Sequence, residues 1–77
     1  MKNKITIYTD QYSYFCEKTR EWLQKHHFEY EEKDVKLPQN TEELFKISEQ
    51  YAVPVIIADD KVILGYNEEK LKEILLD

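Results

Sequence analysis

The sequence predicts an α/β fold in which a four-stranded mixed sheet carries helices on both faces. Two observations lead to this fold class. Short runs of β-branched and aromatic residues, typical of strands, alternate with longer segments whose apolar residues recur at helical spacing. The last two strand runs are separated by only two residues, which predicts an antiparallel hairpin. The expected order of elements is therefore β-α-β-α-β-β-α, in one domain spanning residues 1–77.

The first half of the chain predicts a strand, a helix and a second strand. Ile5 to Tyr8 is a β-branched and aromatic run suited to a buried strand. Residues 14–26 form one helical face from Phe15, Thr19, Trp22, Leu23 and His26. Residues 28–35 then alternate in polarity, which is typical of a strand exposed on one side. Because such crossover connections are almost always right-handed, we expect the two strands to be parallel.

The second half opens with a helix. Leu37 and Pro38 break the strand pattern, and Asn40 followed by Glu43 fits a capping box at a helix N-terminus. We therefore expect this helix to begin at Asn40. Its inner face is expected to carry Leu44, Ile47, Ser48 and Tyr51.

The chain ends with a hairpin and a third helix. Residues 53–58 and 61–64 are β runs joined by Asp59 and Asp60. Gly65 closes the hairpin, and the side chain of Asn67 can accept a hydrogen bond from a free amide of the next helical turn. The apolar stripe of that last helix consists of Leu71, Ile74 and Leu75.

The composition limits the classes of partner. With 11 Lys and Arg against 16 Asp and Glu, the formal net charge is −5, so the positive field that drives nucleic-acid binding is missing. No apolar run approaches the roughly 18 residues of a membrane span, and the first residues lead directly into a strand rather than into a signal peptide. We therefore expect a cytoplasmic protein that binds neither nucleic acid nor membrane.

The segment DQYSYFCEKT, residues 10–19, contains the single cysteine of the chain, Cys16, and a serine three positions earlier, Ser13. A CxxC motif between a strand and a helix is a redox dithiol, because thiols one helical turn apart can close a disulfide. A serine hydroxyl cannot do so. A lone cysteine is more often an inert core residue. His26 and His27 point to different sides of the helix, so no metal site is predicted.

Four segments, together with the length and the order of elements, carry a family resemblance. The segments ITIYT, SYFCEKTREWL, FEYEEKDV and AVPVIIADDKVILGYNEEKL resemble a small bacterial glutaredoxin of the thioredoxin fold, over nearly the whole chain. The family pattern is a strand, CPYC, a helix, a ThrValPro segment with a cis proline, and a glycine-containing turn that opens the last helix. The resemblance implies a glutathione-dependent thiol-disulfide oxidoreductase. It also implies a monomer whose partners are glutathione and glutathionylated or disulfide-bearing proteins.

The resemblance assigns roles to individual residues. Ser13 occupies the nucleophilic cysteine position and Cys16 the resolving one. The backbone of Val53, before a cis Pro54, is expected to pair with glutathione as an added strand. The remaining residues assigned to the glutathione site are Tyr14, Phe15, Gly65, Asn67 and Glu68, of which Asn67 and Glu68 meet the γ-glutamyl end.

Besides Ser13, further positions depart from the family pattern. Asp10 and Thr41 stand where many glutaredoxins carry a cation for a glutathione carboxylate, which predicts weak glutathione affinity. His27 and Asp60 stand where relatives often have glycine. Both places commonly require φ > 0, so mild backbone strain is expected there.

Three interpretations of Ser13 remain open. Ser13 replaces a cysteine or selenocysteine of a redox-active glutaredoxin, which leaves this chain impaired; or the chain is a glutathione- or peptide-binding module without chemistry; or Cys16 acts as a slow monothiol nucleophile. A further alternative is an NrdH-type redoxin, which accepts electrons from thioredoxin reductase and donates them to ribonucleotide reductase. Those proteins usually show a TrpSerGly-containing turn, whereas residues 63–67 read IleLeuGlyTyrAsn, which favours glutaredoxin.

Overall fold

The structure is a computed structural model and describes residues 3–76. Its elements are β1 (Ile5–Thr9), α1 (Tyr14–Lys25), β2 (Glu31–Asp34), α2 (Pro38–Ser48), β3 (Val55–Ala58), β4 (Lys61–Leu64) and α3 (Glu68–Leu75). The strand order in the sheet is β2-β1-β3-β4. As predicted, β1 and β2 are parallel and β3 and β4 form an antiparallel hairpin, while β1 and β3 are also antiparallel.

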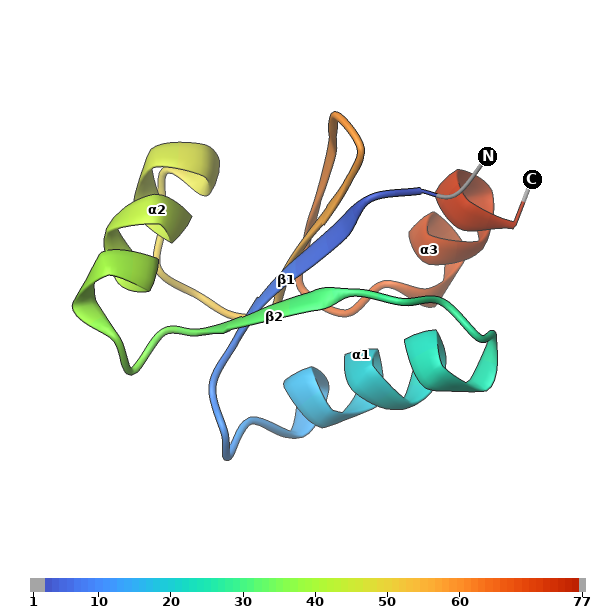
Figure 1. Cartoon of the computed structure of the whole chain (residues 1–77), viewed down its shortest axis with the longest axis horizontal. Coiled ribbons are helices and arrows are strands. Elements are labelled where there is room, and N and C mark those ends of the chain that lie inside the picture. The colour runs from blue at the N-terminus through green and yellow to red at the C-terminus, as the bar shows by residue number, and fades with distance from the viewer. Residues whose placement is uncertain (1–2, 77) are drawn as a thin grey trace.

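Helices cover both faces of the sheet, and Figure 1 shows α2 on the side away from α1 and α3. Side chains alternate along each strand, so β1 and β3 supply apolar residues to both faces. The face under α1 and α3 holds the larger core, which consists of Ile5, Ile7, Trp22, Leu23, Ile56, Ala58, Ile63, Leu71 and Leu75. The face under α2 holds a smaller core of Tyr8, Leu44 and Val55. Burying one such aliphatic side chain stabilises the fold by about 1.5–3 kcal/mol.

The C-terminus of α1 confirms the prediction for His27. The chain adopts φ 62° at His27, the left-handed region that favours glycine. The His27 amide donates to the Gln24 carbonyl (3.1 Å) and the Phe28 amide to the Leu23 carbonyl (2.9 Å). These two bonds form a Schellman motif, which satisfies carbonyls that the end of the helix leaves free. Phe28 packs on the larger core and so belongs to this turn rather than to β2.

Two expectations for the first half were wrong. The second strand is shorter than residues 28–35, because the turn after α1 uses the first of these residues. Phe15 was expected on the buried face of α1 but is 55% exposed, whereas Cys16 is fully buried.

The expected start and inner face of α2 were also wrong in part. Leu37 is the N-cap and Pro38 lies at the first helical position, where its missing N–H costs nothing. Asn40 lies within the first turn, and its side chain donates to the Asp34 carbonyl (2.9 Å) instead of capping the helix. Leu44 is buried as expected, but Ile47 is 42% exposed. Tyr51 is exposed and lies after the helix end.

The hairpin turn has its strained residue one position earlier than expected. The left-handed residue is Asp59, at φ 57°, rather than Asp60. The Asp59 amide donates to the Lys4 carbonyl (2.9 Å), and its carboxylate accepts from the Lys4 amide (2.9 Å). These bonds continue the pairing of β3 with the start of β1 and select the conformation of the turn.

Candidate active site

The register of the sheet brings three segments to one end of the molecule. Tyr8 pairs with Val55, and Val55 pairs with Leu64. The loop after β1, the segment before β3 and the turn after β4 therefore leave the sheet at the same end. The Gly65 amide donates to the Pro54 carbonyl (2.8 Å), which ties two of these segments together. The Val53–Pro54 bond is cis, as expected.

Ser13 is the N-cap of α1. Its backbone is extended, with φ −76° and ψ 128°, and its hydroxyl oxygen accepts a long hydrogen bond from the Cys16 amide (3.4 Å). Its carbonyl accepts from the Glu17 amide (3.1 Å), the first bond of the helix. Position 13 therefore lies at the positive end of the α1 dipole, beside a free amide, where a negative charge is stabilised.

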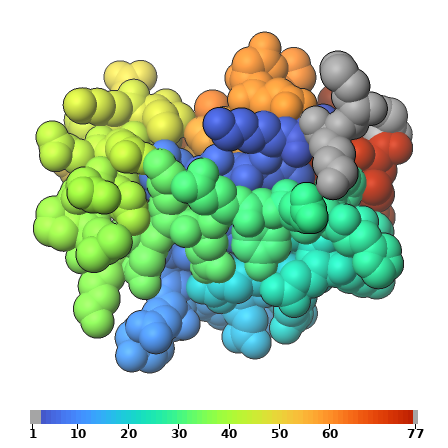
Figure 2. All heavy atoms as spheres, viewed as in Figure 1, coloured from blue at the N-terminus to red at the C-terminus, as the bar shows by residue number. Residues whose placement is uncertain are grey.

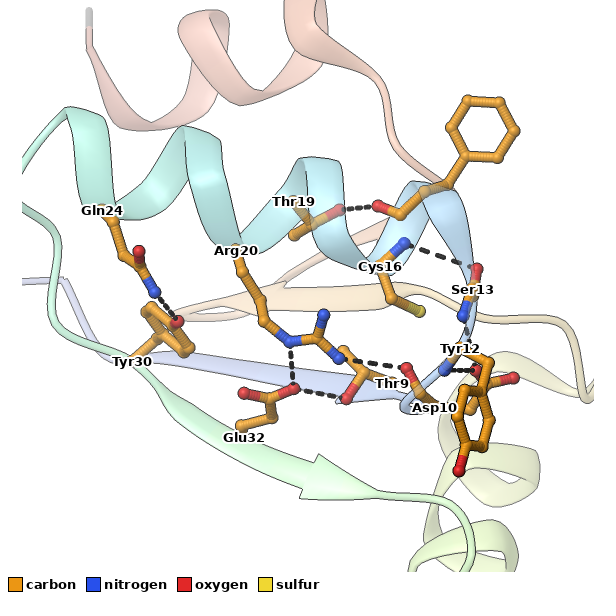
Figure 3. Close-up of polar contacts among 11 residues, drawn as sticks. Thr9, Asp10, Tyr12, Ser13, Cys16, Thr19, Arg20, Gln24, Tyr30 and Glu32 are labelled. Atoms are coloured by element: carbon orange, nitrogen blue, oxygen red, sulfur yellow. Dashed lines mark hydrogen bonds and ion pairs between the residues drawn. The ribbon is translucent and has the colours of Figure 1, made fainter.

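Cys16 lies one turn into α1 and is fully buried. In Figure 3 its sulfur points from the helix toward the loop that carries Asp10 and Ser13. Residues three apart share a helical face, so a thiol at position 13 lies within closing range of this sulfur. The first position, Ser13, is half-buried and the second, Cys16, is fully buried.

The loop between β1 and α1 is held by the carboxylate of Asp10. Its Oδ1 accepts from the amides of Tyr12 and Ser13, each at 2.8 Å. The Asp10 carboxylate therefore organises the loop and contributes negative charge beside position 13. Tyr12, at the tip, is 91% exposed.

A second group of polar residues lies below α1, and the sequence analysis did not identify it. Arg20 donates to the Glu32 carboxylate (2.6 Å) and to the Asp10 carbonyl (3.0 Å), and Thr9 donates to the same Glu32 oxygen (2.7 Å), as Figure 3 shows. Thr9 is buried. The one signal in the sequence was the spacing of Arg20, four residues after Cys16, which places both on one helical face.

Aromatic residues surround the N-terminus of α1 on the side of α3. Tyr14 is exposed, and Lys18 lies over its ring, 5.5 Å from the centroid. Tyr66, after Gly65, packs against the larger core, and burial followed by the charge of Glu68 raises its pKa. Electrostatic interaction with Tyr14, followed by the charge of Glu21, raises the pKa of Lys18.

The turn into α3 places the last predicted site residues. The Asn67 side chain accepts from the Lys70 amide (3.1 Å) and caps α3, as expected. Glu68 is the first residue of that helix and is exposed. Both residues follow Gly65 and lie at the end of the sheet that also carries position 13.

Two surface hollows lie along α2 and beside the loop between β1 and α1. One, of about 550 Å³, is lined by Val35, Lys36, Pro38, Thr41, Glu42, Phe45, Lys46 and Tyr51. The other, of about 270 Å³, is lined by Asp10, Gln11, Tyr12, Asp34, Val35 and Lys36, and Figure 2 shows the notch between the segments around residues 11 and 36. They share Val35 and Lys36, so they form one surface from Tyr51 to Tyr12. The hydroxyl of Thr41 donates to the Val35 carbonyl (2.6 Å).

Within residues 3–76, no three His, Cys, Asp or Glu side chains lie close enough together to hold a metal ion. In the same part of the chain, no helix has the length and the apolar character needed to cross a bilayer.

Comparison with known proteins agrees with this geometry. The family model for glutaredoxin matches residues 5–63. An uncharacterized glutaredoxin-like 8.6 kDa protein in the rubredoxin operon of Clostridium pasteurianum is 29% identical over 72 residues, which cover 92% of this chain and 96% of that protein.

Solved structures share the architecture. A glutaredoxin from Archaeoglobus fulgidus superposes with a TM-score of 0.88 at 33% identity, over 97% of this chain and 88% of that one. The NrdH-redoxin of Escherichia coli, a glutaredoxin-like protein with a thioredoxin-like activity profile, superposes with a TM-score of 0.82 at 26% identity, over 92% and 93% of the two chains. The matched family model covers well over half of the sequence, and the sheet and helices agree with those of solved relatives, so the chain belongs to the glutaredoxin family of thioredoxin-fold redox proteins.

Proposed function

We propose that the N-terminus of α1 is a glutathione-dependent thiol-disulfide exchange site, and that Ser13 holds the nucleophile position in a form that cannot exchange. The observation that carries this proposal is the bond from the Cys16 amide to the Ser13 oxygen. A thiolate at position 13 would accept a hydrogen bond from the same amide and would lie at the positive end of the same helix dipole. Both interactions favour the charged form of the sulfur.

The chemistry that the site would support with a thiol at position 13 is a two-step exchange. The thiolate attacks the glutathione sulfur of a glutathionylated protein, a new disulfide forms to glutathione, and the protein leaves as a thiolate that takes up a proton. A second glutathione thiolate then attacks that mixed disulfide, releases oxidised glutathione and regenerates the thiolate. Cys16 would act as the resolving thiol on substrates that stay attached to position 13.

Serine stops this cycle at its first step. A hydroxyl has no accessible anionic form near neutral pH and forms no disulfide. The remaining thiol, Cys16, is buried and therefore poorly placed to attack a bulky disulfide. The chain with Ser13 is thus expected to bind glutathione without turning it over.

The glutathione site that we propose runs along the cis Val53–Pro54 segment. The Val53 backbone would pair with the tripeptide as an added strand, while the α3 N-terminus would receive the γ-glutamyl carboxylate. Lys36 and Lys46 line the larger hollow and could supply positive charge for the other carboxylate. Asp10 opposes binding through its negative charge, so a weak affinity is expected. Glutathione-rich cytoplasm is the compartment that suits this chemistry.

The variant Ser13→Cys tests the proposal. It should form an intramolecular disulfide with Cys16 and reduce a glutathionylated peptide with glutathione as the electron donor. The unchanged chain should show no rate above background. The double variant Ser13→Cys/Cys16→Ser serves as the control, because it should retain deglutathionylation by the monothiol route while losing the disulfide. A Ser13→Cys protein that closes the disulfide but never uses glutathione would overturn the glutathione part of the proposal.

A second candidate is an NrdH-type redoxin that receives electrons from thioredoxin reductase. The similarity to the Escherichia coli NrdH-redoxin and the carboxylate of Asp10 beside position 13 favour this candidate. The same Ser13→Cys protein distinguishes the two. Reduction of its disulfide by thioredoxin reductase and NADPH, with no reduction by glutathione, would select the NrdH-type function.

A further inference from the structure

We infer that Arg20 is a positioning residue of this redox site: its guanidinium fixes the β1–α1 loop and, together with Glu32, sets the charge balance under positions 13 and 16. The inference rests on the proposed function, because it concerns a thiol pair at these positions. It assigns a role to a residue that lies outside the SxxC motif and outside the expected glutathione contacts.

The position of Arg20 on α1 is the first step of the argument. Residues 13, 16 and 20 are spaced by three and four, so they lie on one face of the helix. In Figure 3 the guanidinium of Arg20 and the sulfur of Cys16 point from α1 to the same side. The Arg20 side chain is only 22% exposed, so its charge is less screened by water than that of a surface arginine.

The contacts of Arg20 connect three elements. It donates from Nε to Glu32 on β2 (2.6 Å) and from a terminal nitrogen to the Asp10 carbonyl in the loop (3.0 Å). The Asp10 carboxylate in turn holds the Tyr12 and Ser13 amides. Movement of Arg20 would therefore be transmitted through Asp10 to the backbone of position 13.

This group contains one cation, the Arg20 guanidinium, and two carboxylates. Burial lowers the pKa of Arg20, but its hydrogen bond to the Glu32 carboxylate and then the charge of Glu32 outweigh this effect and hold the pKa above its ordinary value. The remaining charged side chain of the group is Asp10, in the loop. Arg20 is thus the cation that opposes Glu32 and Asp10 in this group.

The redox consequence follows from the balance of the exchange reaction. Reduction of a disulfide between positions 13 and 16 by two glutathione molecules yields the dithiol and oxidised glutathione, and the two electrons come from the glutathione thiols. The reduced pair can carry a thiolate, whereas the disulfide carries no charge. A nearby cation therefore favours the reduced form, and a nearby anion opposes it.

The experiment compares two charge-removing variants in the full chain with Ser13→Cys. Arg20→Gln should lower the equilibrium constant for reduction by about threefold, which is about 15 mV. Glu32→Gln keeps an acceptor oxygen for Thr9 and Arg20 but removes the anion, so it should raise that constant by a similar factor. If Arg20 and Glu32 acted only by holding the structure in place, the two variants would shift the equilibrium constant in the same direction or not at all. Either result would overturn the electrostatic role. Equilibration in dithiothreitol buffers measures the constant without any need for glutathione activity.

Two further variants separate charge from geometry. Arg20→Lys keeps the positive charge and should restore most of the equilibrium constant. Lys25→Gln removes a cation from the last turn of the same helix, and no shift is expected because the site lies at the other end. A shift from Lys25→Gln as large as that from Arg20→Gln would refute a local role.

The positioning role is tested in the present chain, which keeps Ser13. Arg20→Gln should speed hydrogen exchange at the Tyr12 and Ser13 amides by about tenfold and leave the amides of β3 unchanged. Exchange that is unaltered at both loop amides, or faster throughout the protein, would overturn this role. This measurement remains decisive even if Ser13→Cys closes no disulfide, so failure of the proposed function and failure of this inference give different results.

Discussion

Tyr8 on β1 and Glu43 on α2 are joined by a hydrogen bond of 3.0 Å from the phenol to the carboxylate. Lys33 on β2 donates to the same carboxylate oxygen (2.7 Å) and lies 5.9 Å from the centre of the Tyr8 ring. These contacts attach α2 to the two strands beneath it. The hydrogen bond from Lys33, followed by that from Tyr8, holds the pKa of Glu43 below its ordinary value, so the carboxylate stays charged in mildly acidic solution.

The first prediction concerns the alkaline behaviour of Tyr8. Burial, followed by the hydrogen bond to Glu43, raises the pKa of Tyr8. The neutral phenol therefore contributes stability that is fully present below about pH 10 and is lost as the pH rises through the pKa of Tyr8 in the folded protein. At pH 7, Tyr8→Phe should cost about 1 kcal/mol, and this cost should disappear above pH 10. Urea unfolding of both proteins at pH 7 and above pH 10 measures the difference. A stability cost of Tyr8→Phe that grows with pH would contradict the stabilising role of the neutral Tyr8 phenol.

The second prediction contrasts two residues of α2 that the sequence pattern placed on one face. Leu44→Ala should destabilise the protein by about 2–4 kcal/mol, because it opens a cavity in the smaller core. Ile47→Ala should cost less than about 1 kcal/mol, because much of that side chain is already in water. Chemical denaturation of the matched pair checks this. Equal costs would mean that Ile47 is buried in solution.

The third prediction uses the left-handed residue after α1. His27→Gly should stabilise the protein by about 0.5–1 kcal/mol, since glycine adopts φ 62° without the clash of a Cβ. His27→Ala, which retains the Cβ, should give no such gain. Thermal unfolding of the two variants provides the comparison, and a gain from alanine alone would exclude backbone strain as the cause.

The fourth prediction concerns the accessibility of Cys16. Because the side chain is fully buried, iodoacetamide should modify it about 100-fold more slowly in the folded protein than in urea. Mass spectrometry of samples taken over time at neutral pH gives both rates. Comparable rates would mean that the first turn of α1 opens freely, and would strengthen the interpretation of Cys16 as a monothiol nucleophile.

The fifth prediction concerns the charge of Asp10. In the Ser13→Cys protein, Asp10→Asn keeps an oxygen for the Tyr12 and Ser13 amides but removes a negative charge beside the site. The kcat/KM for glutathione should rise by about two- to fivefold at low salt and by less at high salt. Asp60→Asn is the matched control, since it removes the same charge from the hairpin turn at the other end of the sheet. An equal rise in both variants would point to net charge alone.

The first and last strands and the last helix could be predicted because local sequence specifies them. Lys61–Leu64 is a short β run between turn residues, and Asn67 precedes a helical stripe with acidic residues in the first turn. The start of α2 could not be read in this way. Pro38 is both a strand breaker and a favourable first helical residue, and the Asn40 side chain donates to the carbonyl of Asp34, the last residue of β2, instead of capping the helix.

Only those parts of the candidate site that are close together in the sequence could be predicted. Ser13 and Cys16 lie within one helical turn of each other, so their proximity follows directly from their spacing in the sequence. The pairing of Arg20 with Glu32 depends instead on the register of β1 with β2, which matches Ile7 to Glu32. A helical pattern places Arg20 on a face but does not identify the strand residue opposite to it.

The cap at position 13 connects folding with redox poise. A thiolate at position 13 would accept a charge-assisted hydrogen bond from the Cys16 amide. A sulfur in a disulfide is a weak acceptor. With cysteine, this cap would make α1 more stable in the reduced state than in the oxidised state. In a closed thermodynamic cycle, each 1.4 kcal/mol of that difference in stability raises the reduction potential of the disulfide by about 30 mV. Serine removes the link, so α1 keeps the same stability in every redox environment.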